Sequence, residues 1–128
     1  MDLNEKNIIE VGRISKKEMK KFEVLGIEAR DMIVIVRNSL NNNKNHIEKH
    51  FDFVSENPDY LDKIVDWIKN AKYGSRDFIH GDNHYNLLFE KEINHYFHIS
   101  LLILDDIIVC SIRKQTIIKL DKKILDKG

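Results

Sequence analysis

The sequence has few of the residues that cross-link small domains or interrupt their secondary structure: its 128 residues include one cysteine, Cys110, and one proline, Pro58. A single cysteine excludes a disulfide within the chain, and a domain of this length buries enough surface to fold without one. Cys110 lies in an apolar run, which favours a buried, unreactive thiol over a nucleophile. We therefore expect one domain over residues 1–128, in a reducing compartment such as the cytoplasm.

Long hydrophobic runs are also missing. No apolar run approaches the roughly 20 residues that cross a bilayer, and the longest, "HISLLILDDIIVCSI", is interrupted by Asp105 and Asp106. The N-terminal "MDLNEKNIIEVGRIS" lacks the basic segment followed by an apolar segment that marks a secretory signal. We expect neither membrane insertion nor export by that route.

The chain has no excess charge of either sign, because 21 Lys and Arg residues balance 21 Asp and Glu residues. The molecule as a whole therefore has no bulk attraction for nucleic acid or for an acidic membrane. Residues 111–128 nevertheless carry six basic side chains against two acidic ones: Arg113, Lys114, Lys119, Lys122, Lys123 and Lys127. This local excess either faces an anionic partner or forms the solvated side of an amphipathic helix.

Capping residues and hydrophobic spacing predict the order of the elements. Ser15 and Glu18 form a capping box that begins a helix, and Gly26 suits its end. The β-branched run "DMIVIVR" predicts a buried strand. The expected elements are an extended segment in "IIEVGRIS", a helix over 16–25, a strand over 31–37, a helix after Asn38 or Ser39, a helix from Pro58 to near Gly74, strands within 77–93, 95–104 and 106–114 with a tight turn at Asp105-Asp106, and a closing helix from Thr116.

These elements place helices in the first half of the chain and strands in the second. That order favours an α+β fold, in which N-terminal helices pack on one face of an antiparallel β-sheet and a short helix closes the C-terminus. Trp67 is expected in the core, and Tyr85, Tyr96 and Phe97 in cross-strand packing. The other sheet face, or a groove at one edge, is left free for function.

The common chemical motifs are absent: there is no glycine-rich phosphate loop, no CxxC pair and no nucleophile elbow. Six histidines remain, and four of them form two HxxxH pairs, His46/His50 and His80/His84. Residues four apart lie on one side of a helix, so His46 and His50 can act together. The second pair spans the turn-like "HGDNH", where helical spacing does not apply. Surface histidines, acid–base catalysis and zinc ligation all remain open.

Acid–base cleavage of RNA needs few parts and no metal. A base accepts the proton of the 2′-hydroxyl, an acid protonates the leaving 5′-oxygen, and cations stabilise the charged transition state. His46 and His50 can supply the first two, Arg113 and Lys114 the third, and Thr116 or Ser111 a hydroxyl donor.

Four segments, in this order, resemble the phage-associated barnase, EndoU, colicin and RelE-like nuclease domains: "VGRISKK", "ARDMIVIVRNSLNNNKNHIEKHF", "NPDYLDKIVDWIKNAKYG" and "IRKQTIIKLDKKILDKG". The resemblance runs from about Ile9 to the end of the chain. It implies a barnase-like fold and a metal-independent, cofactor-free endoribonuclease of the toxin or phage-effector kind, which leaves a 2′,3′-cyclic phosphate. His46 and His50 match the helical H-x-x-x-H positions. Arg113, Lys114 and Thr116 occupy the region that carries further polar catalytic groups.

Under this hypothesis the partner is RNA, either tRNA or another single-stranded RNA, contacted by Tyr73, Lys49 and Lys119, and an inhibitory protein is a possible second partner. Tyr73 can stack on a base or simply pack in a loop. A net charge of zero differs from what the resemblance leads us to expect of an RNA-cleaving toxin. It suits an alternative, a non-catalytic binding protein such as an immunity protein or a phage-associated interaction module. A zinc-dependent hydrolase is a third hypothesis.

Overall fold

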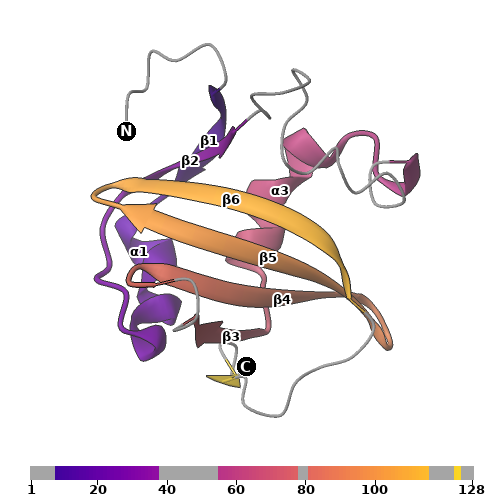
Figure 1. The fold of residues 1–128 in the computed structure, drawn as a ribbon. Helices are drawn as coiled ribbons and strands as arrows, with labels where there is room; N and C mark the ends of the chain where they lie inside the picture. The colour runs from indigo at the N-terminus through magenta and orange to yellow at the C-terminus, as the bar shows by residue number, and fades with distance from the viewer. Residues whose placement is uncertain (1–7, 38–54, 78–80, 116–122, 125–128) are drawn as a thin grey trace.

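The computed structural model describes residues 8–37, 55–77, 81–115 and 123–124. Its strands form one seven-stranded sheet with the order β1-β2-β6-β5-β4-β3-β7 (Figure 1). The strands are β1 (Ile8–Ile14), β2 (Met32–Arg37), β3 (Tyr73–Arg76), β4 (His84–Glu92), β5 (His95–Leu104), β6 (Ile107–Gln115) and the two-residue β7 (Lys123–Ile124). The described residues also form the helical segments α1 (Lys16–Met19), η1 (Lys20–Leu25) and α3 (Tyr60–Lys69), of which α3 is the longest.

The predicted fold class is wrong, because strands dominate the described chain and the sheet is mixed rather than antiparallel. β1 and β2, the extended segment and the strand predicted in the first half of the chain, form an antiparallel pair and belong to the same sheet as the later strands. β2 then lies parallel to β6, with Ile33 opposite Ile107 and Ile35 opposite Val109. β2 is apolar at consecutive positions, and such a strand is covered on both faces, which is typical of a strand inside a sheet.

The predicted closing helix is also wrong where the structure describes it. Lys123 and Ile124 form β7, which pairs antiparallel with Gly74 and Tyr73 of β3. An edge strand presents unpaired N–H and C=O groups, and a returning segment satisfies them more completely than a helix lying nearby. The predicted helix after Asn38 or Ser39 lies outside the described residues.

The local predictions from capping and turn chemistry are confirmed. The Ser15 hydroxyl accepts a hydrogen bond from the Glu18 N–H at 3.2 Å, and the Glu18 carboxylate accepts one from the Ser15 N–H at 3.0 Å. The helical segment ends at Gly26, with φ of 91°. Asp105, with φ of 53°, makes the tight turn between β5 and β6. The long helix, by contrast, ends at Lys69 rather than near Gly74, which lies in β3 opposite Leu87.

The core lies between the helices and one face of the sheet. In Figure 1, α1 and α3 lie behind β4, β5 and β6. Trp67 of α3 is 6% exposed, as predicted, and its ring centroid lies 4.8 Å from that of Phe97 and 6.1 Å from that of Phe89. Phe97, Ile99 and Leu101 alternate along β5 toward this core. The intervening residues of β5 therefore project from the opposite face, because successive strand residues alternate in direction.

No helix in the described part of the chain is long and apolar enough to cross a membrane.

Candidate functional site

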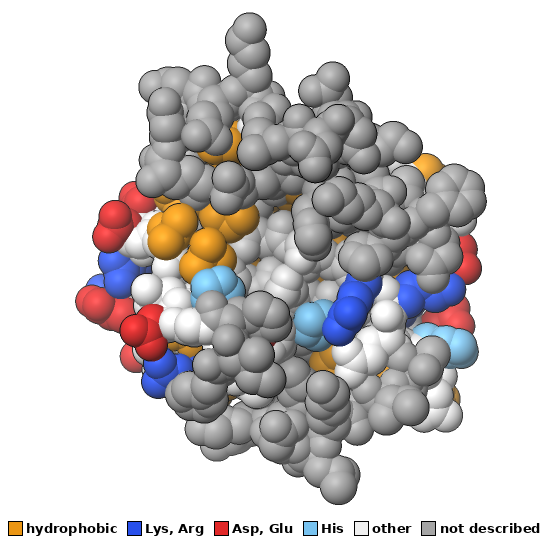
Figure 2. Space-filling view, in the orientation of Figure 1, with side chains coloured by type: hydrophobic (Ala, Val, Ile, Leu, Met, Phe, Trp, Pro, Cys, Tyr) orange, Lys and Arg blue, Asp and Glu red, His pale blue; other side chains and the backbone are white. Residues whose placement is uncertain are grey.

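Small polar residues lie side by side on the sheet face that α1 and α3 leave uncovered. Ser75, Asn86, Ser100 and Ser111 are in register across β3, β4, β5 and β6. The adjacent row in the same four strands is Tyr73, Leu88, His98 and Arg113. We call the two rows without Leu88 the polar face: Tyr73, Ser75, Asn86, His98, Ser100, Ser111 and Arg113. Figure 2 shows this side of the molecule, with histidine and basic side chains and polar surface between them.

A chain of hydrogen bonds joins three residues of the polar face. Arg113 Nε donates to His98 Nδ1 at 3.3 Å, and His98 Nε2 lies 2.9 Å from Asn86 Oδ1. The Arg113 guanidinium remains charged and can only donate, so His98 Nδ1 accepts and carries no proton. The ring proton then lies on Nε2, where Asn86 accepts it. Asn86 thus fixes His98 as one neutral tautomer, and His98 orients Arg113.

The guanidinium of Arg113 is available to an anion. The side chain is exposed, and its one contact with the described residues is the Nε–His98 bond. No carboxylate of the described residues pairs with it. The terminal nitrogens of an arginine form the planar fork that binds phosphate or carboxylate oxygens in pairs. Arg113 is therefore an oriented cation with the chemistry to bind an anion.

Two hydroxyl groups lie in the row of the polar face next to the row of Arg113. The Ser100 and Ser111 Oγ atoms are hydrogen-bonded at 2.6 Å, and both side chains are half-buried. Each hydroxyl has one proton and two lone pairs, so the pair retains capacity to donate or accept toward a ligand on this face. This combination of a fixed cation, a neutral imidazole and hydroxyls suits a phosphodiester better than a hydrophobic ligand.

A carboxylate lies on the same face, one row beyond His98. Glu90 of β4 is opposite Tyr96 of β5, and its carboxylate lies 3.7 Å from Lys72 Nζ. Burial raises the pKa of the Tyr96 phenol, and so does its hydrogen bond with Glu90. Glu90 and His98 are cross-strand diagonal neighbours, a relation that spans about 7–8 Å and brings long side chains within reach. Glu90 is thus a neighbour of His98, while Arg113 lies one strand further away.

The predicted site residues separate on the structure. Arg113 and Tyr73 lie on the polar face, whereas Lys114 points to the opposite face and its Nζ lies 2.9 Å from Glu56 Oε1. Lys114 and Glu56 line a hollow of about 350 Å³ beside the β4–β5 hairpin. Arg113 and Lys114 are consecutive in a strand, so they cannot serve one site from the same side. Five predicted residues lie outside the described chain: His46, Lys49, His50, Thr116 and Lys119.

Two other histidines do not join His98. His84 is on the same face but is opposite Leu102, four residues from His98 along β5. At about 3.4 Å per strand residue and about 4.8 Å between strands, the two residues are roughly 14 Å apart. His84 instead has its Nδ1 3.1 Å from the Asp82 carbonyl oxygen. His95 is exposed at the start of β5. His80, the partner of His84 in the second HxxxH pair, lies outside the described residues.

Sequence reasoning missed His98 and Asn86, although one signal could have found the first. The predicted turn at Asp105-Asp106 sets the register of its hairpin. Counting outward from this turn pairs Ser100 with Ser111 and His98 with Arg113, as the structure has them. The contact between the triplet "HIS" (98–100) and the triplet "SIR" (111–113) could thus have been predicted from the sequence. Asn86 carried no such signal, because the turn between β4 and β5 includes a bulge near Glu90.

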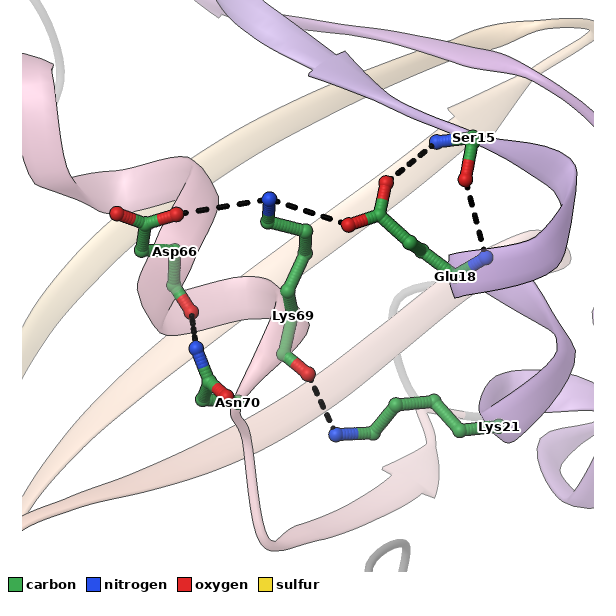
Figure 3. Close-up of polar contacts among 6 residues, drawn as sticks. All are labelled: Ser15, Glu18, Lys21, Asp66, Lys69 and Asn70. Atoms are coloured by element: carbon green, nitrogen blue, oxygen red, sulfur yellow. Dashed lines mark hydrogen bonds and ion pairs between the residues drawn. The ribbon is translucent and has the colours of Figure 1, made fainter.

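A second polar cluster has a structural role (Figure 3). Lys69 Nζ lies 3.1 Å from a Glu18 oxygen and 3.5 Å from an Asp66 oxygen, so one cation joins α1 to α3. Lys21 Nζ donates to the carbonyl oxygens of Lys69 at 2.6 Å and Ala71 at 3.0 Å, which lie at the end of α3. The backbone N–H of Ser15, and then Lys69, lower the pKa of Glu18. The charges of this cluster compensate one another and leave little for a ligand.

Among the residues that the structure describes, no three His, Cys, Asp or Glu side chains gather as ligands for a metal ion. Cys110 is 3% exposed, and burial raises the pKa of its thiol to about 12, which confirms the prediction of a buried cysteine.

Comparison of the chain with protein-family models, with curated proteins and with solved structures gave no match.

Proposed function

We propose that this protein is a metal-independent endoribonuclease and that Arg113 binds the phosphate at which RNA is cleaved. The observation that supports the proposal is the chain Asn86–His98–Arg113, which holds an exposed guanidinium in one orientation on the sheet face opposite α1 and α3. A preorganised cation stabilises a transition state better than a mobile one, because no reorganisation is needed when charge develops.

The reaction follows from groups that this chain possesses. A base accepts the proton of the ribose 2′-hydroxyl while that oxygen bonds to phosphorus, and the bond from phosphorus to the 5′-oxygen breaks as an acid protonates it. The products are a 2′,3′-cyclic phosphate and a free 5′-hydroxyl. His98 is the imidazole directly opposite Arg113. His46 and His50 keep their predicted acid–base roles in this proposal, and Arg113 binds the phosphate oxygens.

Phosphate binding can leave the support of Arg113 in place. The hydrogen bond from Arg113 Nε occupies the lone pair of His98 Nδ1. The terminal nitrogens of Arg113 can bind the phosphate oxygens without breaking that bond. His98 therefore orients the cation, and the acid–base roles stay with His46 and His50.

The test is cleavage of total RNA and defined tRNAs by the purified protein in excess chelator, with identification of the product ends. Arg113→Ala should lower the rate by about 10²–10³-fold, as expected for loss of one charge-stabilising donor group, and Arg113→Lys should recover only part of it because lysine lacks the planar fork. Arg13→Ala is the matched control, since Arg13 is exposed, is paired with Glu10 and is aligned with Ile107, at the other end of β6 from Arg113. His46→Ala and His50→Ala test the two predicted acid–base groups.

Each variant must melt at the temperature of the wild type before its rate is interpreted. Cleavage by wild type that survives chelator and is lost in folded Arg113→Ala supports the proposal. Unchanged cleavage by Arg113→Ala contradicts the assigned phosphate site, and no cleavage of any RNA by wild type contradicts the enzymatic function.

The balance of 21 basic and 21 acidic residues favours a second candidate, a non-catalytic binding protein that recognises its partner by mixed charge. It predicts a tight protein complex and no RNA cleavage, which a pull-down with the same purified protein would test.

A further inference from the structure

The outer surface of β5 and β6 changes from polar to apolar along the two strands. Ser100 is opposite Ser111, and two residues nearer the turn Leu102 is opposite Val109. Side chains two apart in a strand project from the same face, so Leu102 and Val109 share the face of Arg113. These four side chains are half-buried and Arg113 is exposed, so each keeps part of its surface accessible. We call these five residues the outer strip.

The face is closed on both sides of the outer strip. Leu88 of β4, in the row of Arg113, is buried, and so is Ile35 of β2, in the row of Val109. A ligand held by Arg113 therefore meets accessible side chains along β5 and β6 rather than across the sheet toward Leu88. Figure 2 shows a group of hydrophobic side chains on the left of this face, away from the basic side chains on the right.

The order of chemical groups along the outer strip matches that in a nucleotide. The strip begins with the oriented guanidinium of Arg113, continues with the hydrogen-bonded hydroxyls of Ser100 and Ser111, and ends in aliphatic carbon. A nucleotide has an anionic phosphate, a sugar that exchanges hydrogen bonds, and a base with two apolar faces. Bases pack against apolar side chains as well as aromatic ones.

We propose that single-stranded RNA lies along β5 and β6, with the reacting phosphate on Arg113 and one base packed on Leu102 and Val109. This inference rests on the proposed function for the identity of that phosphate. Val109 precedes Arg113 by four residues in one strand, a separation of roughly 14 Å. A stacked strand advances about 3.4 Å per nucleotide, so the packed base lies within about four nucleotides of the phosphate. The ligand is single-stranded, because neighbouring base pairs cover the faces of a base in a duplex.

The test compares two probes that cannot be cleaved. A hexamer of deoxyadenosine and a hexamer of abasic deoxyribose carry the same phosphates, lack the 2′-hydroxyl and differ only in their bases. Fluorescence anisotropy gives the affinity of each probe for wild type, Leu102→Thr, Val109→Thr and Arg113→Ala. Wild type should bind the adenine probe about 5- to 30-fold more tightly than the abasic one, and each threonine variant should lower that ratio at least twofold. Arg113→Ala should weaken binding of both probes by a similar factor.

Ile103→Thr is the matched control. Ile103 follows Leu102 in β5 and is also half-buried, but it packs against the core on the other face of the sheet. The same substitution there should leave the ratio of the two affinities unchanged in protein that remains folded. An equal loss of the ratio in Ile103→Thr would show a general effect of destabilisation and would overturn the assignment of the base to the outer strip.

The remaining outcomes separate this inference from the nuclease function. Equal binding of the two probes by wild type, or a ratio that both folded threonine variants retain, overturns the inferred path, even if RNA is cleaved in a manner that depends on Arg113. A ratio that falls in the threonine variants, together with no cleavage of RNA by wild type, overturns the nuclease function and leaves the path along β5 and β6 intact.

Discussion

Gly12 is the position where a single added carbon should disturb the fold most clearly. It lies at a bulge in β1, with φ of +154°, and a Cβ built there would approach Val65 Cγ2 of α3 to 2.8 Å. The other Val65 carbons lie 3.6 and 3.8 Å from that Cβ, so rotating the side chain gives little relief. Overpacking costs about 1–3 kcal/mol and an unfavourable backbone conformation about 1–3 kcal/mol more. We expect Gly12→Ala to lower the free energy of unfolding by about 2–6 kcal/mol.

Urea denaturation of a double-mutant cycle separates the two costs. Val65→Ala removes the methyl group that the new Cβ would meet, so the loss in the double variant should be smaller than the sum of the single losses by about 1–2 kcal/mol. Gly26→Ala is the control, because Gly26 also has a positive φ, 91°, but its added Cβ would have no neighbour within 4 Å. Its cost should not depend on Val65. Strict additivity of Gly12→Ala and Val65→Ala would refute the packing argument.

Two further predictions concern ionisable groups. The pKa of Glu18 is lowered from its usual 4.5 in the folded protein, so its stabilisation is complete above pH 4.5 and is lost as the pH falls through the folded value. The urea midpoint of Glu18→Gln should therefore lie below that of wild type at pH 7 and approach it at pH 3, while the exposed Glu92→Gln shows no such change; a gap that persists at pH 3 would contradict this. The Cys110 thiol, buried and with its pKa raised to about 12, should resist an aromatic disulfide reagent at pH 8 until the protein is unfolded. Rapid reaction of the native protein would show that it is accessible.

The functional proposal depends on a feature of sheets rather than on a motif. Alternation along β5 and β6 separates the apolar Ile99 and Ile112, which face the core, from His98 and Arg113, which face outward. The same alternation divides the predicted cations, so that Lys114 pairs with Glu56 while Arg113 remains available to an anion. One face of these strands thus builds the core and the other can carry chemistry.

The sequence predicted local structure well wherever nearby residues determine it. The Ser15–Glu18 capping box, the turn at Asp105-Asp106 and the buried β2 all depend on contacts or preferences within a few residues. The hairpin register that pairs His98 with Arg113 follows from the same turn. Burial of Trp67 and Cys110 followed from the apolar character of their neighbours.

Only the tertiary structure decided which distant segments meet. The parallel pairing of β2 with β6, the return of β7 to β3 and the alignment of Tyr73 with Arg113 each join residues far apart in the chain. Such pairings are selected by burial of one sheet face and by satisfaction of edge hydrogen bonds, and many registers share the same local pattern. The sequence by itself therefore determined the capping box, the turn and one hairpin of the site, whereas the order of strands determined that a tyrosine, an imidazole and a guanidinium share one face.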